Sequence, residues 1–304
     1  TKKGLLWILE LLVFVAVFLV ASIAQGFATV PMQLVMLFSD KAYMAAAASG
    51  DVAKLTEASM EVTQRLMESD GYMIGMLFSD IVMMLIVFLF CRFIQKRKLR
   101  TLGFIKKGML KEYGLGMLLG FAFFSVCVLL GVLFGGLKIE GISPEFSIGI
   151  FVAYLLGYMV QGMTEEVLCR GYFLGSYARR YPVYAAVLAN SLLFASLHLL
   201  NSGISVLAFI NIMLFGIFAS IYFIRRGSIW GIGAFHSIWN LVQGNFYGIK
   251  VSGTPVGNTL FTTQAIAGKS LWNGGDFGME GSLICTIFII STLKSDFVYI
   301  RKKQ

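Results

Sequence analysis

Long apolar segments that end at charged residues constrain the fold of this 304-residue chain more than any other feature. A membrane-spanning helix needs about 20 apolar residues and a spanning β-strand only about 9–11, and these segments fit the helix. Only 13% of the residues are charged, about half the share of a soluble domain. We therefore predict an all-α fold, a polytopic membrane helix bundle of about eight transmembrane helices. The expected spans lie near residues 5–30, 72–93, 115–137, 147–172, 183–200, 204–224, 229–248 and 281–300.

Basic residues alternate between the connecting segments, and this alternation predicts the topology. They lie at Lys2 and Lys3, from Arg92 to Lys111, at Arg170, Arg179 and Arg180, at Arg225 and Arg226, and from Arg301 to Lys303. Cytoplasmic loops carry the excess of lysine and arginine, so both termini are expected in the cytoplasm. The net charge of +9 then reflects topology, and the lack of one basic stripe argues against a nucleic-acid partner. The expected setting is the lipid bilayer of a bacterial plasma membrane.

The chain is expected to divide near residue 114. Residues 1–114 would hold two N-terminal transmembrane helices, an external segment at 39–71 and a basic cytoplasmic loop. Residues 115–304 would form the membrane core. The external segment has helical character, and the sequence leaves open whether it is a surface helix or a lid. Residues 249–280 are rich in Gly, Thr and Asn, which predicts a loop on the outer side.

Two pairs of glycines lie four residues apart in the third expected span. Gly116 and Gly120 form the first pair, and Gly131 and Gly135 form the second. Small residues at this spacing let two helices in a membrane approach closely. We therefore expect both pairs to lie where this span packs inside the bundle.

Charged and polar side chains interrupt three of the expected spans. Each such group costs roughly 2.5–3.5 kcal/mol to insert, which favours a task for it inside the protein. Glu166 and Arg170 lie four residues apart on one helix face and can pair, whereas Glu165 is rotated by about 100° from Glu166. His236 and Asn240 are again four apart, on a later span. One carboxylate could thus face a cavity while its neighbour is held by the arginine.

A hairpin about Arg180–Pro182 would bring Glu165 and His198 together. Both lie about 24 Å along their helices from this turn. Part of that length, beyond Arg170, is polar enough to protrude into the cytosol. His236 can reach a similar level from its own span. Because packed helices lie about 8–10 Å apart, we predict that Glu165, His198 and His236 lie within about 8 Å of a common point. That point is expected nearer the cytoplasmic face and open to a cavity.

These residues resemble the CAAX protease and bacteriocin-processing family of intramembrane endopeptidases. The family is recognised by Glu-Glu-x-x-x-Arg, then Phe-x-x-x-His, then His-x-x-x-Asn or Asp, on three of its membrane helices. Here the motifs stand in order as Glu165-Glu166…Arg170, Phe194…His198 and His236…Asn240. The resemblance covers roughly residues 115–300, so it implies that residues 115–304 form a catalytic membrane core.

The resemblance implies a role for each residue of the first two motifs. Glu165 looks like the general base that activates a water for attack on a peptide carbonyl. Glu166 and Arg170 look like a supporting pair that orients the site. His198 is similar to the family histidine that assists the water or the leaving amine.

The third motif implies stabilisation of the oxyanion by His236 and Asn240. Glu165, His198 and His236 could also form a zinc set. However, no His-Glu-x-x-His helix is present, and asparagine and arginine beside the site suit oxyanion binding better than metal binding. We therefore favour a glutamate-activated water and no cofactor, and leave zinc as the alternative.

Three functions are compatible with the sequence. The favoured one is an intramembrane endopeptidase acting on a membrane-associated peptide or protein. The second is a non-proteolytic membrane immunity or regulatory protein of the same family, and bacteriocin processing or immunity is its expected context. The third is a proton-coupled transporter with a relay of Glu165, His198 and Asp80, which would need a continuous polar path through both leaflets. Outside such a relay, Asp80 and Glu10 are expected to be structural acids.

Overall fold

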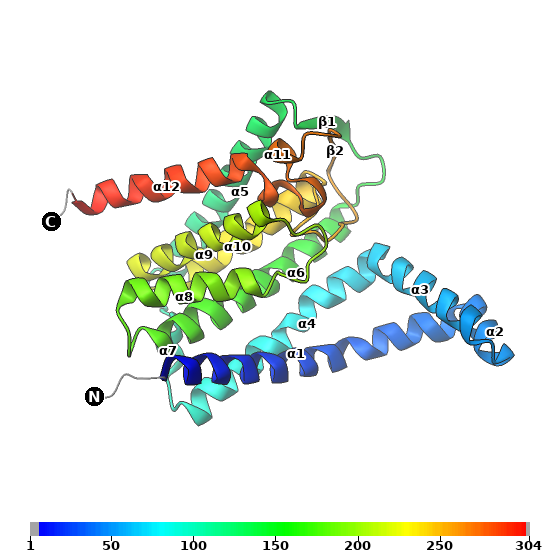
Figure 1. Cartoon of the computed structure of the whole chain (residues 1–304), viewed down its shortest axis with the longest axis horizontal. Coiled ribbons are helices and arrows are strands. Elements are labelled where there is room, and N and C mark those ends of the chain that lie inside the picture. The colour runs from blue at the N-terminus through cyan, green and yellow to red at the C-terminus, as the bar shows by residue number, and fades with distance from the viewer. Residues whose placement is uncertain (1–5, 302–304) are drawn as a thin grey trace.

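The computed structural model describes the backbone of residues 6–301 and the side chains of residues 6–294, and it is mostly helical (Figure 1). The helices are α1 (Leu6–Ser39), α2 (Lys41–Ser49), α3 (Val52–Glu68), α4 (Asp70–Leu89), α5 (Met109–Leu133), α6 (Ile148–Glu166), α7 (Gly175–Tyr177), α8 (Val183–Ser196), α9 (Val206–Arg226), α10 (Ile229–Leu241), α11 (Ser270–Asn273) and α12 (Leu283–Arg301). The strands β1 (Leu137–Ile142) and β2 (Phe261–Ala265) pair antiparallel. The basic residues expected at Lys2, Lys3, Lys302 and Lys303 lie outside the described residues.

Three of these helices continue into π-helical turns. The turns span Phe90–Ile94 after α4, Val167–Leu174 after α6, and Val242–Phe246 after α10. Short 3-10 turns lie at Leu99–Leu102, Gly275–Phe277 and Met279–Gly281. π-Helical turns inside helices occur frequently at functional sites. The turn after α6 begins directly behind the Glu165–Glu166 pair.

Each of the eight expected spans contains a helix, and several of these helices can cross a membrane. Within the described residues, five are long and apolar enough: Leu6–Ser39, Asp70–Ile94, Met109–Leu133, Ile148–Ala178 and Val206–Arg226. The segments at α8, α10 and α12 do not combine the required length with the required apolar character in that part of the chain. The structure therefore confirms a helical, multi-pass membrane protein. The number of eight spans and the orientation of the termini stay predictions.

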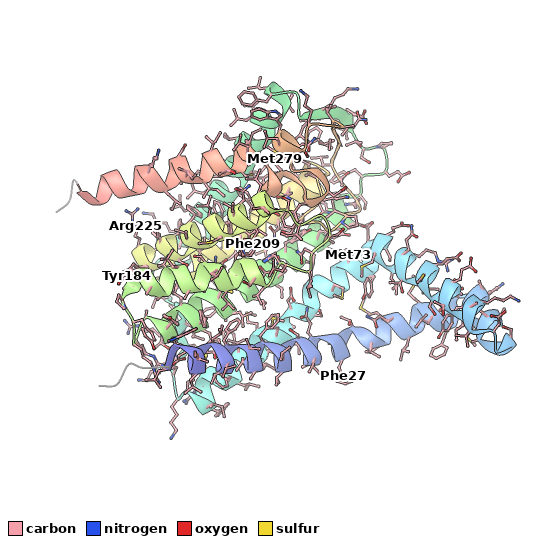
Figure 2. All side chains as sticks on the ribbon, in the orientation of Figure 1. Phe27, Met73, Tyr184, Phe209, Arg225 and Met279 are labelled. Atoms are coloured by element: carbon pink, nitrogen blue, oxygen red, sulfur yellow. The ribbon has the colours of Figure 1, made fainter. Side chains whose placement is uncertain are left out.

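Apolar side chains cover the outer surface of the long helices. In α1 and α4 about four-fifths of the most apolar window lies outside the protein core, since 22% and 17% of it is buried. Phe27, which is 72% exposed, lies on the outer side of α1 (Figure 2). Exposed apolar area of this extent on long helices is what a lipid environment requires.

Helix α10 is the innermost element and carries the third motif. Every residue of α10 from Gly231 to Leu241 is buried. The helix packs against α5 on one side and α6 on another, while α8 packs on α9. The N-terminal pair joins the bundle through α4, which packs against both α1 and α6. Residues of α4 therefore lie next to the helix that carries Glu165, with α1 packed on α4.

The first glycine pair confirms the expected close packing of α5. A Cβ atom at Gly116 would lie 2.0 Å from the carbonyl oxygen of Gly231, and one at Gly120 would lie 2.6 Å from that of Phe235. The two helices therefore approach with backbone against backbone, which only glycine permits at these positions.

The expectation for the second pair is wrong at Gly135. Helix α5 ends at Leu133, and Gly135 has a φ of +66°. This left-handed conformation, which glycine adopts without strain, turns the chain toward β1. Gly131 stays in the helix, where a Cβ atom would lie 2.8 Å from a methyl carbon of Leu137. Of this pair, Gly131 thus lies on a packing face of α5, and Gly135 lies just after the end of the helix.

Gly116→Ala is expected to destabilise the protein by about 1–3 kcal/mol, because the added methyl group overpacks the α5–α10 contact. Gly114→Ala is the matched control, since nothing lies within 4 Å of a Cβ atom there. This control should be neutral or stabilising by up to about 1 kcal/mol, because alanine favours the helix. Thermal unfolding of both variants in the same detergent measures the difference. Equal stabilities would contradict the packing argument.

The external segment at 39–71 forms two helices, as its composition suggested. Asp40 caps α2 by accepting from the Tyr43 N–H at 2.8 Å, and its other oxygen pairs with Arg65 of α3 at 2.6 Å. Asp51 caps α3 in the same way. Figure 1 shows α3 beyond the end of α4 and beside the last turns of α1, with α2 at the far end, so most of the segment extends away from the core.

The segment at 249–280 is irregular, as expected, but it also contains β2, which the sequence did not predict. Strand β2 pairs with β1, and the register shifts between Ile139 and Gly141. After β2 the chain forms α11 and two 3-10 turns before α12 begins at Leu283. This segment covers the end of the bundle near the expected site (Figure 1).

Candidate active site

A cavity of about 370 Å³ brings the three motifs together. Its wall is formed by α1, α3, α4, α6, the turn after α8, α10 and the segment that follows α10. The lining residues are Gln25, Met67, Met73, Met76, Leu77, Asp80, Tyr154, Tyr158, Gln161, Glu165, His198, Asn201, His236, Asn240, Val251, Ser252 and Thr254. Glu165, His198, His236 and Asn240 thus share one cavity, and the turn between α7 and α8 confirms the expected hairpin.

Glu165 is held by a hydrogen bond at one carboxylate oxygen and accepts none at the other. Gln161 donates from Nε2 to Glu165 Oε1 at 2.5 Å, and Asn240 donates from Nδ2 to Gln161 Oε1 at 3.0 Å. Glu165 Oε2 is buried and accepts no hydrogen bond from the described residues. It lies 3.7 Å from His236 Nε2. A buried carboxylate oxygen without a donor is suited to accept a proton from a bound molecule.

Glu166 faces away from the cavity and forms a buried charged triad. Arg170 NH1 donates to Glu166 Oε1 at 2.9 Å, and both side chains are fully buried. His236 Nδ1 lies 2.9 Å from the same oxygen. A carboxylate only accepts, so His236 carries a proton on Nδ1 and its Nε2 turns toward Glu165. The arginine also stacks on the Phe194 ring at 4.3 Å. The triad therefore fixes the orientation of the His236 ring.

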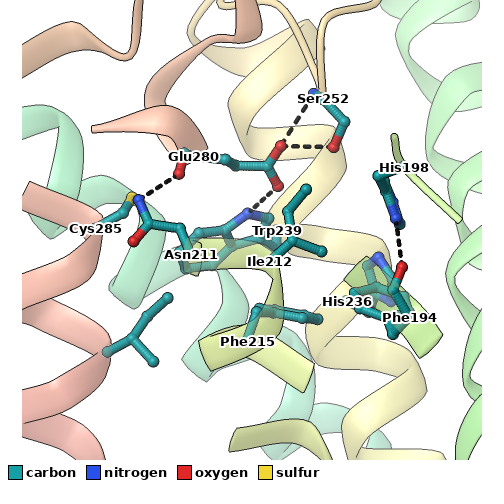
Figure 3. A pocket seen from close by; sticks show the side chains of 11 residues that line it. Phe194, His198, Asn211, Ile212, Phe215, His236, Trp239, Ser252, Glu280 and Cys285 are labelled. Atoms are coloured by element: carbon teal, nitrogen blue, oxygen red, sulfur yellow. Dashed lines mark hydrogen bonds between the residues drawn. The ribbon is translucent and has the colours of Figure 1, made fainter. Parts of the chain in front are cut away.

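His198 presents its second ring nitrogen to the cavity. Helix α8 ends at Ser196, and His198 follows in the next turn with Nδ1 2.9 Å from the carbonyl oxygen of Phe194 (Figure 3). The carbonyl can only accept, so the proton lies on Nδ1 and the Nε2 lone pair is free to accept a hydrogen bond. His198 and Glu165 thus contribute two hydrogen-bond acceptors to the lining of one cavity.

Glu280, which the sequence did not single out, anchors the segment that covers the site. Its carboxylate accepts from Trp239 Nε1 at 3.0 Å and from the N–H and Oγ of Ser252 at 3.0 and 2.7 Å (Figure 3). Asn201 donates to the Ser252 carbonyl at 2.9 Å. A second, smaller cavity of about 30 Å³ lies between this anchor and the histidines. The signal in the sequence was one acid in an otherwise uncharged stretch, 277–284.

Asp80 also lies in the cavity, whereas Glu10 has the structural place expected for it. Glu10 pairs with Arg180 at 3.0 Å, outside the cavity. Asp80 accepts from Gln25 Nε2 at 2.5 Å and shares the cavity wall with Glu165. Gln161 was missed as well, although it lies four residues before Glu165 on the same helix face. No spacing in the sequence predicts that α4 packs beside α6, which is the contact that brings Asp80 close to Glu165.

The cavity does not lie beside the basic loops, which is where we expected it. Val251, Ser252 and Thr254 of its wall belong to the segment at 249–280, and none of its lining residues comes from a basic loop. Figure 2 shows Arg225 at one end of the bundle and Met73 toward the other, where the external helices begin. The physical reason is that residues Val167–Leu174 stay helical and buried. The chain beyond Arg170 therefore closes the site from that side.

No group of three or more His, Cys, Asp or Glu side chains among the described residues is arranged to hold a metal ion. The zinc set left open by the sequence, Glu165, His198 and His236, thus lacks a ready-made arrangement. His236 uses Nδ1 to bind Glu166 and Glu165 uses Oε1 to bind Gln161, which leaves His236 Nε2 and Glu165 Oε2 as the atoms that a metal would contact. Whether a metal takes part stays a prediction.

The comparisons with known proteins find one similarity. Residues 146–242 match the family model described as Type II CAAX prenyl endopeptidase Rce1-like. This range contains all three motifs, from Glu165 to Asn240. Neither a curated protein nor a solved structure matches the chain significantly.

Proposed function

We propose that this chain, whose residues 146–242 form a domain of the Rce1-like type II CAAX prenyl endopeptidase family, is an intramembrane endopeptidase. Its substrate is a membrane-associated peptide or protein, and its expected setting is a bacterial plasma membrane. The observation that carries the proposal is the buried, unpartnered Oε2 of Glu165 in the cavity that also holds His198, His236 and Asn240.

The attacking water is activated between two acceptors. Glu165 Oε2 takes one proton from the water, while His198 Nε2 accepts the hydrogen bond of the other. The water oxygen then forms a bond to the peptide carbonyl carbon. Collapse of the tetrahedral intermediate breaks the C–N bond, and the proton held by Glu165 passes to the leaving amine. Gln161 keeps the carboxylate in place by its hydrogen bond to Oε1.

The negative charge on the carbonyl oxygen is stabilised by Asn240 and His236. Asn240 has two N–H groups, and one of them already donates to Gln161. The other can donate to the oxyanion. His236 donates its Nδ1 proton to Glu166, so it can donate from Nε2 only as an imidazolium. Before the attack, the carboxylates of Glu165 and Glu166 on either side compensate the charge of this imidazolium. Once Glu165 has taken the proton from the water, the oxyanion replaces its negative charge.

The test of this function is a comparison of new peptide termini in membranes. Cells that produce the wild-type protein are compared with cells that produce Glu165→Gln, and N-terminal peptides are identified by mass spectrometry. Termini that depend on Glu165 support the peptidase and identify its substrates. Equal sets of termini, together with a phenotype that does not need Glu165, would favour the non-proteolytic immunity or regulatory role.

Chelation is expected to leave most of the activity in place, because the proposed water activation needs only Glu165 and His198. Purified protein is treated with EDTA and with 1,10-phenanthroline, and hydrolysis is measured alongside the zinc content. We expect less than twofold loss of activity and well under one zinc per chain. Stoichiometric zinc that is lost together with activity would instead make Glu165, His198 and His236 ligands.

A further inference from the structure

The cavity contains a second carboxylate that comes from outside the matched domain. Asp80 lies on α4 and its donor Gln25 on α1, and both helices precede residue 146. Gln25 donates from Nε2 to Asp80 Oδ1 at 2.5 Å and to Ser79 Oγ at 3.1 Å. Among the described residues, the Asp80 carboxylate forms no ion pair. The Asp80 carboxylate, which lines the cavity and has no cationic partner there, can therefore bind a cationic ligand group.

The position of Asp80 beside Glu165 is fixed by the contact between α4 and α6. Thr164, the residue before Glu165, donates from Oγ1 to the main-chain oxygen of Asp80 at 3.2 Å. One turn earlier on α4, Leu77 packs so closely on Gly157 that an added Cβ atom would lie 2.9 Å from the Leu77 Cβ. The two acids are therefore held at one level of the cavity, on adjacent helices.

The charged groups around the cavity leave a deficit of positive charge. The wall contains two carboxylates, two histidines and two tyrosines, and it contains no lysine or arginine. The guanidinium of Arg170 lies behind Glu166 and is fully buried against it. Two carboxylates that share a cavity of low polarity repel each other, and a cationic ligand group would relieve that repulsion.

An apolar wall adjoins Asp80. Met67 of α3 and Met73, Met76 and Leu77 of α4 line the same side of the cavity. Methionine side chains are flexible and polarizable, so such a wall adapts to apolar groups of different shape. A ligand with a cationic group next to an apolar group would match both features.

We propose that Asp80 is a specificity residue of this cavity, which binds a lysine or arginine side chain of the peptide substrate close to the scissile bond. The methionine wall holds the neighbouring apolar residue. Asp80 accepts hydrogen bonds from the cationic side chain through Oδ2, while Gln25 holds Oδ1. The inference rests on the proposed peptidase function, and it adds a substrate preference that comes from the N-terminal helices.

The first experiment profiles cleavage of a proteome-derived peptide library by the full-length protein in nanodiscs. Wild type should show lysine or arginine enriched within about four residues of the cut, and Asp80→Asn should lose this enrichment. For a basic substrate from this set, Asp80→Asn should lower kcat/KM about tenfold or more through KM. When the lysine of that substrate is replaced by glutamine, the Asp80→Asn substitution should change kcat/KM less than threefold. Glu57→Gln is the control, because it also removes one negative charge but does so at an exposed position on α3. This variant should resemble wild type.

The outcomes separate the two proposals. Cleavage that depends on Glu165 but shows no basic preference would overturn the role of Asp80 and leave the peptidase standing. An equal loss on both substrates in Asp80→Asn would do the same, because it would indicate a structural effect. Absence of any Glu165-dependent cleavage would overturn the peptidase.

A second experiment measures the cationic site without relying on cleavage. Octanoyl-lysine amide should raise the unfolding temperature of wild type more than octanoyl-glutamine amide does, and Asp80→Asn should abolish the difference. No difference between the two ligands with wild type would overturn the cationic site. A difference that persists in Asp80→Asn would place the cation elsewhere.

Discussion

Glu165→Gln is expected to lower kcat for peptide hydrolysis by about 10²–10⁴-fold, the range typical of a lost general base. Glutamine has the same shape, and its carbonyl oxygen can still accept the hydrogen bond that Gln161 donates to Oε1. What it lacks is a second oxygen that can take a proton from water. The variant should therefore fold, and its unfolding temperature should lie within a few degrees of wild type. Single-turnover hydrolysis of a substrate identified in membranes provides the measurement.

The control for this prediction is His198→Gln, which removes the second acceptor but keeps the base. Because His198 assists the water and does not hold the proton, we expect a smaller loss of about 10-fold to 10²-fold. A well-folded Glu165→Gln protein with substantial turnover would remove the proposed mechanism. A larger loss in His198→Gln than in Glu165→Gln would transfer the role of base to the histidine.

The sequence predicted the parts of the site that depend on helix periodicity. The spacing of Glu166 and Arg170 predicted their pairing, and the structure places them 2.9 Å apart. The rotation of Glu165 away from Glu166 predicted that only one carboxylate faces the cavity. The turn near Pro182 predicted that Glu165 and His198 come to one place, and both line the cavity. These features depend on local geometry and on one short connection, which the sequence specifies directly.

The features that the sequence missed depend on contacts between distant segments. Gln25 and Asp80 reach the cavity only because α4 packs against α6 and α1, and no spacing within either helix predicts that contact. The sequence grouped Asp80 with Glu165 and His198 only as a transporter relay, and not as part of a peptidase site. Glu280 is 41 residues from Trp239, to which it binds. The pairing of β1 with β2 likewise joins residues more than a hundred positions apart. The direction of the cavity was misjudged because the stretch after Arg170 looked polar enough to leave the membrane.

Arg170→Met is expected to destabilise the protein by about 3–5 kcal/mol, the cost of leaving a buried charge without its partner. The guanidinium donates to Glu166 Oε1 at 2.9 Å, and neither side chain is exposed to solvent. Its removal leaves Glu166 with only His236, whose Nδ1 lies 2.9 Å from the same oxygen. The histidine ring would lose its fixed orientation, so activity should fall together with stability. Chemical or thermal unfolding in one detergent, combined with a hydrolysis assay, measures both effects.

Two further variants distinguish the loss of charge pairing from the loss of packing. Adding Glu166→Gln to Arg170→Met removes the unpaired carboxylate, so it should restore part of the stability. Activity should stay low, because the amide oxygen can accept the hydrogen bond from His236 Nδ1 but has no negative charge to stabilise the imidazolium. Lys54→Gln breaks the pair with Asp51, in which both side chains are exposed, and should cost no more than about 1 kcal/mol. If the double variant were as unstable as Arg170→Met, the packing of Arg170 on Phe194 would be its main contribution. If Arg170→Met unfolded like Lys54→Gln, the buried triad would contribute nothing beyond a surface ion pair.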